Sequence, residues 1–285
     1  MHDAKITVLL PTFNRREYLP RALEDLKAQT FRDWRCIVVN DGGEPVGDLV
    51  AAAADPRFEL HEREHLGKAA QMNWAMGGVA TKYIAYADDD DEIYANHLET
   101  LYRTAEDSGR EIACTRMKTT ILGPDGEVLE EHLPTFAPIT FETLRYCQNK
   151  CGAAQLTTIH TKSLAERAGG YDEAMRVFID YDFIRRMVRL EEPAVADVVT
   201  ANHILRRKRG ESGDLASISG LWWRDPEAAG RSLIRFFEKD PAALTRLYLD
   251  AGEWLAAKER LEDIEKSRSW RLVISLRKIL HLLRG

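Results

Sequence analysis

The chain has 285 residues, and 45% of them are hydrophobic, which is enough apolar material for one large domain or two small ones. Its 40 basic and 46 acidic residues give a formal net charge of −6, which argues against a protein that binds nucleic acid. The four cysteines form no Cys-x-x-Cys pair, and Cys147 and Cys151 have no nearby pair of histidines. We therefore expect idle thiols rather than a structural zinc site.

The first hundred residues alternate strand and helix patterns. Short runs of β-branched and aromatic residues, each ended by turn residues, predict strands at 6–10, 35–39, 58–62 and 82–87. Apolar residues at helical spacing predict helices at 16–31 and 68–79. This alternation predicts an α/β fold with a mostly parallel sheet and helices on both faces.

The pattern changes after a further predicted helix at 94–109. Residues 112–132 read as two strands joined at a GPDGE turn. Residues 155–175 predict a strand, a helix ended by Gly169 and Gly170, and a loop, and a helix follows at 178–190. We expect this mixed second half to fold onto the first.

Four aspartates and a glutamate, Asp88 to Glu92, follow the predicted strand at 82–87. Their mutual repulsion must be relieved either by water, in an exposed acidic loop, or by a divalent cation. Ligands gather at the carboxyl ends of strands in such sheets, and Asn14, Arg15 and Asp41 follow two other predicted strands. The acid run is therefore predicted to share one rim with these polar side chains.

The order of several segments resembles the family 2 inverting glycosyltransferases of the GT-A fold. These segments are ITVLLPTFNRREYLPRALEDLKAQTFRDWRCIVVNDG, GKAAQMNWAM, the acid run, AGGYDEAM and DYDF. The resemblance covers roughly residues 5–190. It implies a GT-A, Rossmann-like domain with a nucleotide-sugar-binding half at 1–110 and an acceptor-binding half at 111–210. A helical C-terminal region with a basic amphipathic tail is expected at 211–285.

The resemblance also implies site residues. Asp90 is expected to hold Mn²⁺ or Mg²⁺, and Asp180 to be the catalytic base. The residues implied in nucleotide-sugar binding are Pro11, Thr12, Phe13, Asn14, Arg15, Asp41, Lys68, Asn73, Asp88 and Asp89. Those implied in acceptor binding, or in support of the base, are Gly170, Tyr171 and Asp182.

Some readings stay open at this point. Asp89 contacts the ribose in one alignment of the acid run with the family, whereas Asp88 and Asp90 form the metal pair in another. Asp180 suits a base or the N-cap of the helix at 178–190. We expect His160 to be a core or rim residue. The basic run 206–209 is either a solvated face or a lid over the diphosphate.

We expect a metal-dependent inverting glycosyltransferase that moves a sugar from a nucleotide-diphospho-sugar, with UDP favoured, to a hydroxyl of a glycan or glycolipid acceptor. The alternatives are a sugar-1-phosphate nucleotidyltransferase, which should show a Gly-rich phosphate loop, and a non-catalytic sugar-nucleotide-binding protein.

The chain shows no signal-peptide pattern and no run of the ~20 apolar residues that span a membrane, which predicts a cytoplasmic protein. Residues 266–285 carry six basic residues and no acid, with an apolar stripe at helical spacing. This segment suits either packing on the protein itself or in a homodimer, or peripheral contact with anionic lipid at the inner face of the membrane.

Overall fold

The structure is a computed structural model. It describes residues 4–134, 136, 138–140, 154–206, 231, 232, 235 and 239. The predictions for the tail at 266–285, for Cys147 and Cys151 and for the basic residues at 207–209 lie outside the described residues. No helix in the described ranges has the length and apolarity needed to cross a membrane.

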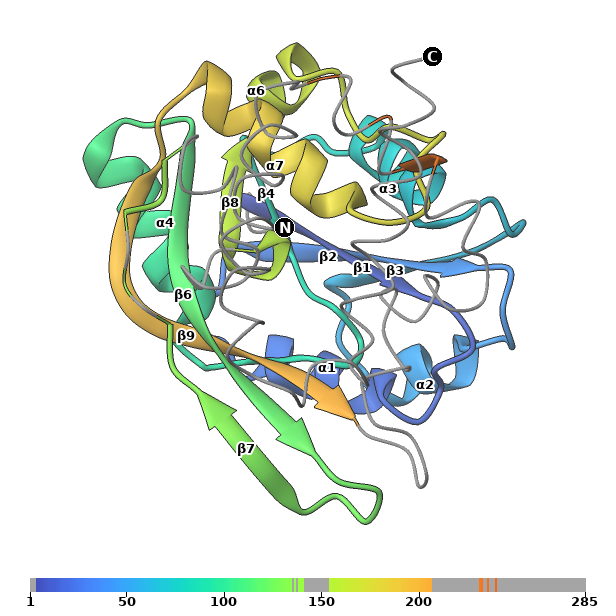
Figure 1. Cartoon of the computed structure of the whole chain (residues 1–285). Coiled ribbons are helices and arrows are strands. Elements are labelled where there is room, and N and C mark those ends of the chain that lie inside the picture. The colour runs from blue at the N-terminus through green and yellow to red at the C-terminus, as the bar shows by residue number, and fades with distance from the viewer. Residues whose placement is uncertain are drawn as a thin grey trace, which may run out of the picture.

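One sheet runs through the described part of the chain, in the strand order β3-β2-β1-β4-β8-β6-β9-β5, with β7 paired to β6 (Figure 1). Its first half consists of β1 (Ile6–Thr12), β2 (Trp34–Asp41), β3 (Phe58–Arg63) and β4 (Tyr83–Tyr86). All pairings among these four strands are parallel. β1, β2 and β4 are almost wholly buried, as expected of strands covered on both faces. The four predicted strands are confirmed.

The second half of the sheet is mixed. It contains β5 (Glu92–Ile93), β6 (Ile112–Leu122), β7 (Val128–His132), β8 (Thr158–Thr161) and β9 (Ala194–Arg206). β8 runs antiparallel to both β4 and β6, whereas β9 runs parallel to β6 and antiparallel to β5. The hairpin predicted at 112–132 is β6–β7. The long strand β9 was not predicted. The parallel arrangement therefore describes the first four strands and the β6–β9 pair rather than the whole sheet.

Helices cover both faces of the sheet, as predicted. One face carries α1 (Leu19–Lys27), α2 (Gly47–Ala52) and α4 (His97–Ser108), and the other carries α3 (Lys68–Gly77), α6 (Lys162–Arg167) and α7 (Ile179–Leu190). Figure 1 shows α3, α6 and α7 above the sheet and α1 and α2 below it. A short 3-10 helix, Gln155–Thr157, precedes β8.

Two apolar layers, one on each face of the sheet, form the core. Alternation of side chains along a strand feeds both layers: Leu9 lies in the layer with α3 and α7, and Val8 and Leu10 lie in the layer with α1 and α4. Helix α1 buries Leu23 and its apolar neighbours at helical spacing in the second layer. This double burial holds the carboxyl ends of β1, β2 and β4 at fixed positions.

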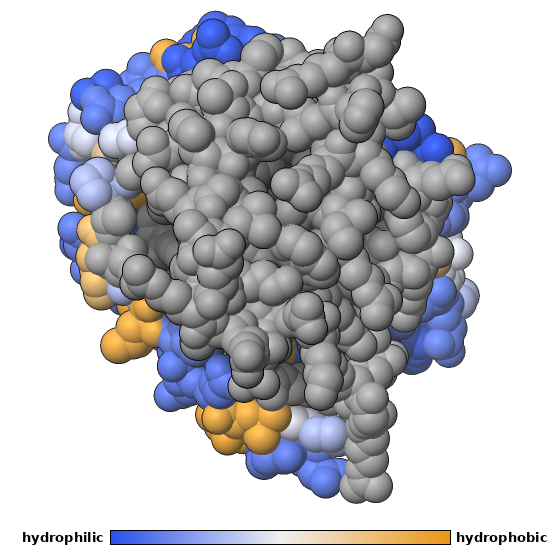
Figure 2. Space-filling view, viewed as in Figure 1, coloured by the Kyte–Doolittle hydropathy of each residue, from blue (hydrophilic) through white to orange (hydrophobic). Residues whose placement is uncertain are grey.

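The β6–β7 hairpin extends beyond these layers, at the lower edge of the molecule in Figure 1. Every residue of β7 is exposed. Hydrophobic residues lie at the same edge in the space-filling view (Figure 2), and β7 contributes the exposed Val128 and Leu129.

Candidate active site

The carboxyl ends of three parallel strands meet at one rim, because β1 pairs with β2 on one side and with β4 on the other. Thr12 ends β1, Asp41 ends β2, and the acid run follows β4. Thr12 Oγ1 donates a hydrogen bond of 2.7 Å to Asp89 Oδ2 across this rim. The shared rim expected from the sequence is therefore present.

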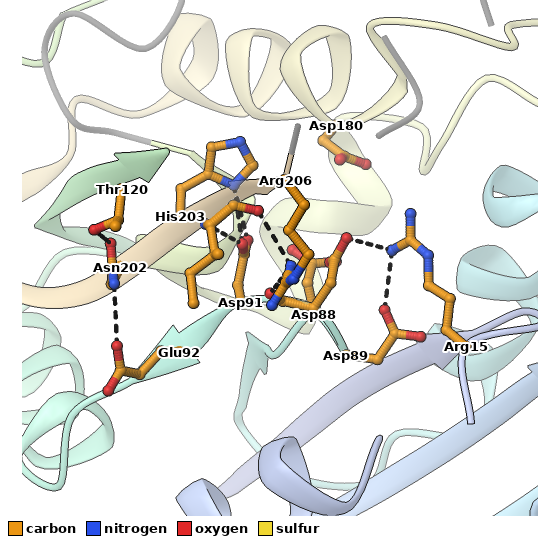
Figure 3. Close-up of polar contacts among 12 residues, drawn as sticks. Arg15, Asp88, Asp89, Asp91, Glu92, Thr120, Asp180, Asn202, His203 and Arg206 are labelled. Atoms are coloured by element: carbon orange, nitrogen blue, oxygen red, sulfur yellow. Dashed lines mark hydrogen bonds and ion pairs between the residues drawn. The ribbon is translucent and has the colours of Figure 1, made fainter. Parts of the chain in front are cut away.

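Arg15 bridges two of the aspartates (Figure 3). Its Nη1 lies 3.1 Å from Asp89 Oδ1 and 2.6 Å from Asp90 Oδ2. Burial raises the pKa of Asp89, while Arg15 and the bond from Thr12 act in the opposite direction. Burial and the neighbouring carboxylates raise the pKa of Asp90 to about 7, although Arg15 opposes the shift. Negative charge is thus concentrated at Asp89 and Asp90, and the Arg15 guanidinium lies against both carboxylates.

The last two acids of the run are bound to β9 instead of the rim. Asp91 accepts hydrogen bonds from the backbone N–H of Ile204 at 2.8 Å and from His203 Nδ1 at 3.0 Å. Burial disfavours the charged imidazole, but the Asp91 carboxylate outweighs it and raises the pKa of His203 to about 9. Glu92 accepts a bond of 3.1 Å from Asn202 (Figure 3). Three aspartates, Asp88 to Asp90, therefore remain to serve the site.

Asp180 lies on the first turn of α7, on the side of the acid run away from Glu92 and Asn202 (Figure 3). Lys68 connects the two sides, with its Nζ 2.9 Å from Asp180 Oδ2 and 3.3 Å from Asp88 Oδ1. The other oxygen, Asp180 Oδ1, is buried and has no hydrogen-bond partner among the described residues. Burial raises the pKa of Asp180, Lys68 lowers it, and burial prevails.

The N-cap of α7 is Phe178, in the left-handed conformation with φ 58°, so Asp180 is not the cap. The alternative interpretation of Asp180 as a capping residue is wrong, because the helix begins at Ile179, two residues earlier than that role requires. An acceptor oxygen that is buried and unbonded costs free energy in the absence of a ligand, which points to a functional use.

Asp182 is fully buried beneath this turn and is bound to two cations. Its Oδ2 lies 2.9 Å from Arg186 Nε and 2.9 Å from Lys239 Nζ. Arg186 in turn donates a bond of 2.7 Å to the carbonyl oxygen of Gly170. Asp182, which the resemblance implied in acceptor binding or in support of the base, is thus connected through Arg186 to the loop at Gly170.

Asn73 fixes the same loop from α3. Its Oδ1 accepts from the backbone N–H of Tyr171 at 2.7 Å, and its Nδ2 donates to the Tyr171 carbonyl at 2.9 Å and to Glu173 at 2.8 Å. The Tyr171 hydroxyl is buried and donates to Gln155. Asn73 was predicted to bind the nucleotide sugar, and in this structure its amide bonds to the loop that follows α6.

The remaining predicted donor residues lie around the end of β2. Phe13 is 41% exposed, and the Asn14 side chain accepts a bond of 3.0 Å from the backbone N–H of Glu44. Pro11 lies within β1. The Asp41 carboxylate is buried and accepts bonds from the loop before α3.

Several contacts of the site were missed by sequence reasoning. Arg206, the last residue of β9, donates to the Asp90 carbonyl at 2.9 Å, and Arg21 donates to the Asp91 carbonyl at 2.6 Å. Arg206 is thus part of the rim, although it was placed in a loop. His160, in contrast, is a core residue as expected: it is buried, and its Nε2 lies 2.6 Å from the Tyr86 hydroxyl.

Comparison with known proteins places the chain in a family. The family model described as glycosyl transferase family 2 matches residues 7–159, more than half of the chain. The chain belongs to glycosyltransferase family 2. The resemblance noted from the sequence motifs is thereby confirmed.

Relatives of this family 2 chain carry glycosyltransferase names. Glycosyltransferase GlyA of Streptococcus pneumoniae serotype 4 is 31% identical over 114 residues, which cover 39% of this chain and 16% of the relative. The putative colanic acid biosynthesis glycosyl transferase WcaA of Escherichia coli K12 is 27% identical over 221 residues, covering 72% of this chain and 74% of the relative. The chain therefore matches about a sixth of GlyA and about three quarters of WcaA.

Solved structures confirm the fold of this family 2 chain. Staphylococcus aureus TarS 1–349 in complex with UDP-GlcNAc has a TM-score of 0.57 at 15% identity, covering 82% of this chain and 73% of that one. A mannosyltransferase from Pyrobaculum calidifontis in complex with GDP-Man and Mn²⁺ has a TM-score of 0.56 at 17% identity, covering 96% and 86%. The predicted GT-A type of α/β fold is confirmed.

Proposed function

We propose that the protein is a metal-dependent inverting glycosyltransferase, which moves a sugar from a nucleotide-diphospho-sugar to a hydroxyl of a glycan or lipid-linked saccharide. The observation that carries this proposal is that Asp180 lies beside the acid run and is joined to Asp88 through Lys68. One carboxylate oxygen of Asp180 is held by Lys68, and the other is buried with no hydrogen-bond partner in the described part of the chain. The fold neighbours were solved with UDP-GlcNAc and GDP-Man, which supports a nucleotide-sugar donor.

The residues of the acid run suit a hard divalent cation. Arg15 already places a positive charge between Asp89 and Asp90, and burial together with the neighbouring carboxylates raises the pKa of Asp90. Within the described residues, no group of three or more His, Cys, Asp or Glu side chains is arranged to hold a metal alone. Mg²⁺ and Mn²⁺ accept one or two protein carboxylates when substrate phosphates supply other ligands. Asp90, with Asp88 or Asp89, would hold such an ion.

When bound, such a cation would neutralise charge on the departing diphosphate. The protein's own groups do the rest. Asp180 accepts the proton of the acceptor hydroxyl as the bond to the anomeric carbon forms, and direct displacement inverts that carbon. Lys68 holds the base in place and keeps a positive charge beside Asp88. Thr12 orients Asp89 for a ribose hydroxyl.

Asp180→Asn tests the proposal, because the amide keeps the shape of the side chain and cannot take the proton. Transfer should fall by roughly 10²-fold or more, the usual scale for loss of a general base, while donor affinity stays near that of the parent. Asp107→Asn, at an exposed position of α4, is the matched control. Donor binding is measured by calorimetry and transfer by release of the nucleoside diphosphate. A variant with near-parental transfer would exclude Asp180 as the base.

A further inference from the structure

His65 lies over the end of β2 in an arrangement that the proposed function does not use. Its ring stacks on Phe13, with the ring centroids 4.4 Å apart and the planes 18° from parallel. Its Nδ1 lies 2.8 Å from the Asp41 carbonyl oxygen and 3.1 Å from Asp41 Oδ2. Both partners are acceptors, so Nδ1 must carry the proton and donate.

The other bonds to the Asp41 carboxylate come from fixed groups. Oδ1 accepts from the backbone N–H of Leu66 at 2.9 Å and from Gln71 Nε2 at 2.6 Å, and Oδ2 accepts from the backbone N–H of Gly67 at 3.1 Å. Gln71 is fully buried. Three of the four donors to this carboxylate are therefore held by the main chain or by burial, and the fourth is the side chain of His65, which a ligand could displace.

The His65 ring is free to move although its backbone is not. The side chain is 58% exposed. Gly42 has φ +72°, and a Cβ added there would lie 2.5 Å from the His65 nitrogen, so the main chain at this point is closely packed. Rotation about the side-chain bonds of an exposed residue needs no change in that packing and occurs within nanoseconds.

We propose that His65 occupies the nucleobase position of the ligand-free protein and is displaced by the base of the donor. The ring shares three properties with such a base: it is flat, it stacks on Phe13, and it gives an N–H to Asp41. A base that replaces it needs a ring N–H beside a ring carbonyl, as in uracil, thymine or guanine. Cytosine and adenine present an unprotonated ring nitrogen at that edge, which would face the Asp41 acceptors unpaired.

This inference rests on the proposed function and makes His65 an internal competitor that sets the affinity for the donor base. Every donor must first replace an internal stack and an internal hydrogen bond. A base that restores both loses little, whereas one that restores only the stack leaves an acceptor unpaired, which costs more than a missing attraction. The ring thus lowers the affinity of every base by the same factor, because each must displace it, while the Asp41 carboxylate distinguishes one base from another.

Calorimetry with UDP, GDP and CDP on the full-length protein tests the proposal. His65→Ala should tighten UDP, GDP and CDP alike by roughly 3- to 10-fold, the equivalent of one aromatic stack, and leave the preference for UDP and GDP over CDP unchanged. His65→Phe keeps the stack and should tighten none of the three nucleotides. His61→Ala is the matched control, because that ring lies on β3, 2.8 Å from Glu59 and beside Trp74.

The outcomes distinguish failure of the role of His65 from failure of the proposed glycosyltransferase function. If the parent binds none of the three nucleotides, both are overturned. If the parent binds UDP or GDP and His65→Ala binds them equally or less tightly, only the role of His65 is overturned. Nitrogen-15 spectra of the parent give a second readout: the His65 Nδ1–H should be protected from exchange without ligand and lose that protection when UDP saturates the protein.

Discussion

Replacing Lys68 by Met removes the one cation that lies between Asp88 and Asp180 in the described structure. The charged Nζ is 2.9 Å from Asp180 Oδ2, and the carboxylate has already had its pKa raised by burial. Methionine keeps a similar length and apolar stem, so the change is mainly one of charge. Two carboxylates would then face each other without a counterion.

The size of the effect follows from the distance. Two unit charges 2.9 Å apart attract by about 6 kcal/mol at an effective dielectric constant of about 20, and the desolvation of both groups offsets part of this. Measured effects of such a neighbour on a carboxylate are about 1 to 3 pKa units. The pKa of Asp180 should therefore rise by about 1 to 3 units in the Lys68→Met variant.

The assay is the pH dependence of the transfer rate. A base works only when ionised, so the rate rises with pH through the pKa of Asp180, and this acidic limb should move upward by the same 1 to 3 units. Lys82→Met, which breaks an exposed pair with Glu106, is the control and should leave the limb in place. A uniform loss of rate with an unmoved limb would refute the coupling of Lys68 to the base.

Four further outcomes are expected. The pKa of His203 is raised to about 9, so its ion pair with Asp91 stabilises the fold fully below pH 6.5 and is lost as the pH rises through about 9. In urea unfolding, His203→Gln should therefore lower the free energy of unfolding by up to about 2 kcal/mol at pH 6 and by almost nothing at pH 10. Arg15→Gln should tighten Mn²⁺ in the absence of nucleotide by about tenfold, measured by the paramagnetic resonance of the free ion, since an internal charge-assisted bond no longer competes. Asp90→Ala should abolish metal-stimulated donor binding in calorimetry and Glu92→Ala should not; equal losses would count against Asp90 as the ligand. Removal of 266–285 should release the protein from anionic vesicles in a sedimentation assay, whereas loss of cooperative unfolding would favour packing of that segment.

The first half of the fold was predictable because burial leaves a simple pattern. Strands covered on both faces read as short apolar runs, and α1 and α3 read at helical spacing. β9 was missed because it mixes buried and exposed positions without strict alternation, and its sequence, AVADVVTANHILR, lacks a run that marks a core strand. Its partners, β6 and β5, lie far away in the sequence.

The site was predictable at the level of the rim and not of the individual contact. The acid run was expected to need a cation, and the structure shows that Arg15, Lys68 and His203 already supply part of that charge. Arg15 and Lys68 were predicted to bind the nucleotide sugar rather than to contact the acid run as counterions, and His203 lies on the strand that was missed. Asn73 shows the same limit, because its amide pairs with a loop nearly a hundred residues later in the chain.

The different contacts of neighbouring residues in the acid run limit which mutations this segment can accept. Asp91 fastens the end of β9, while the residue before it faces the rim. Because the side chains of these two consecutive residues point to opposite sides, insertion or deletion of one residue would move the carboxylate that bonds to β9 to the rim and turn a rim carboxylate towards β9. The segment should therefore accept replacement of single side chains far better than any change in its length, and the spacing between β4 and β5 is the property that its sequence has to keep.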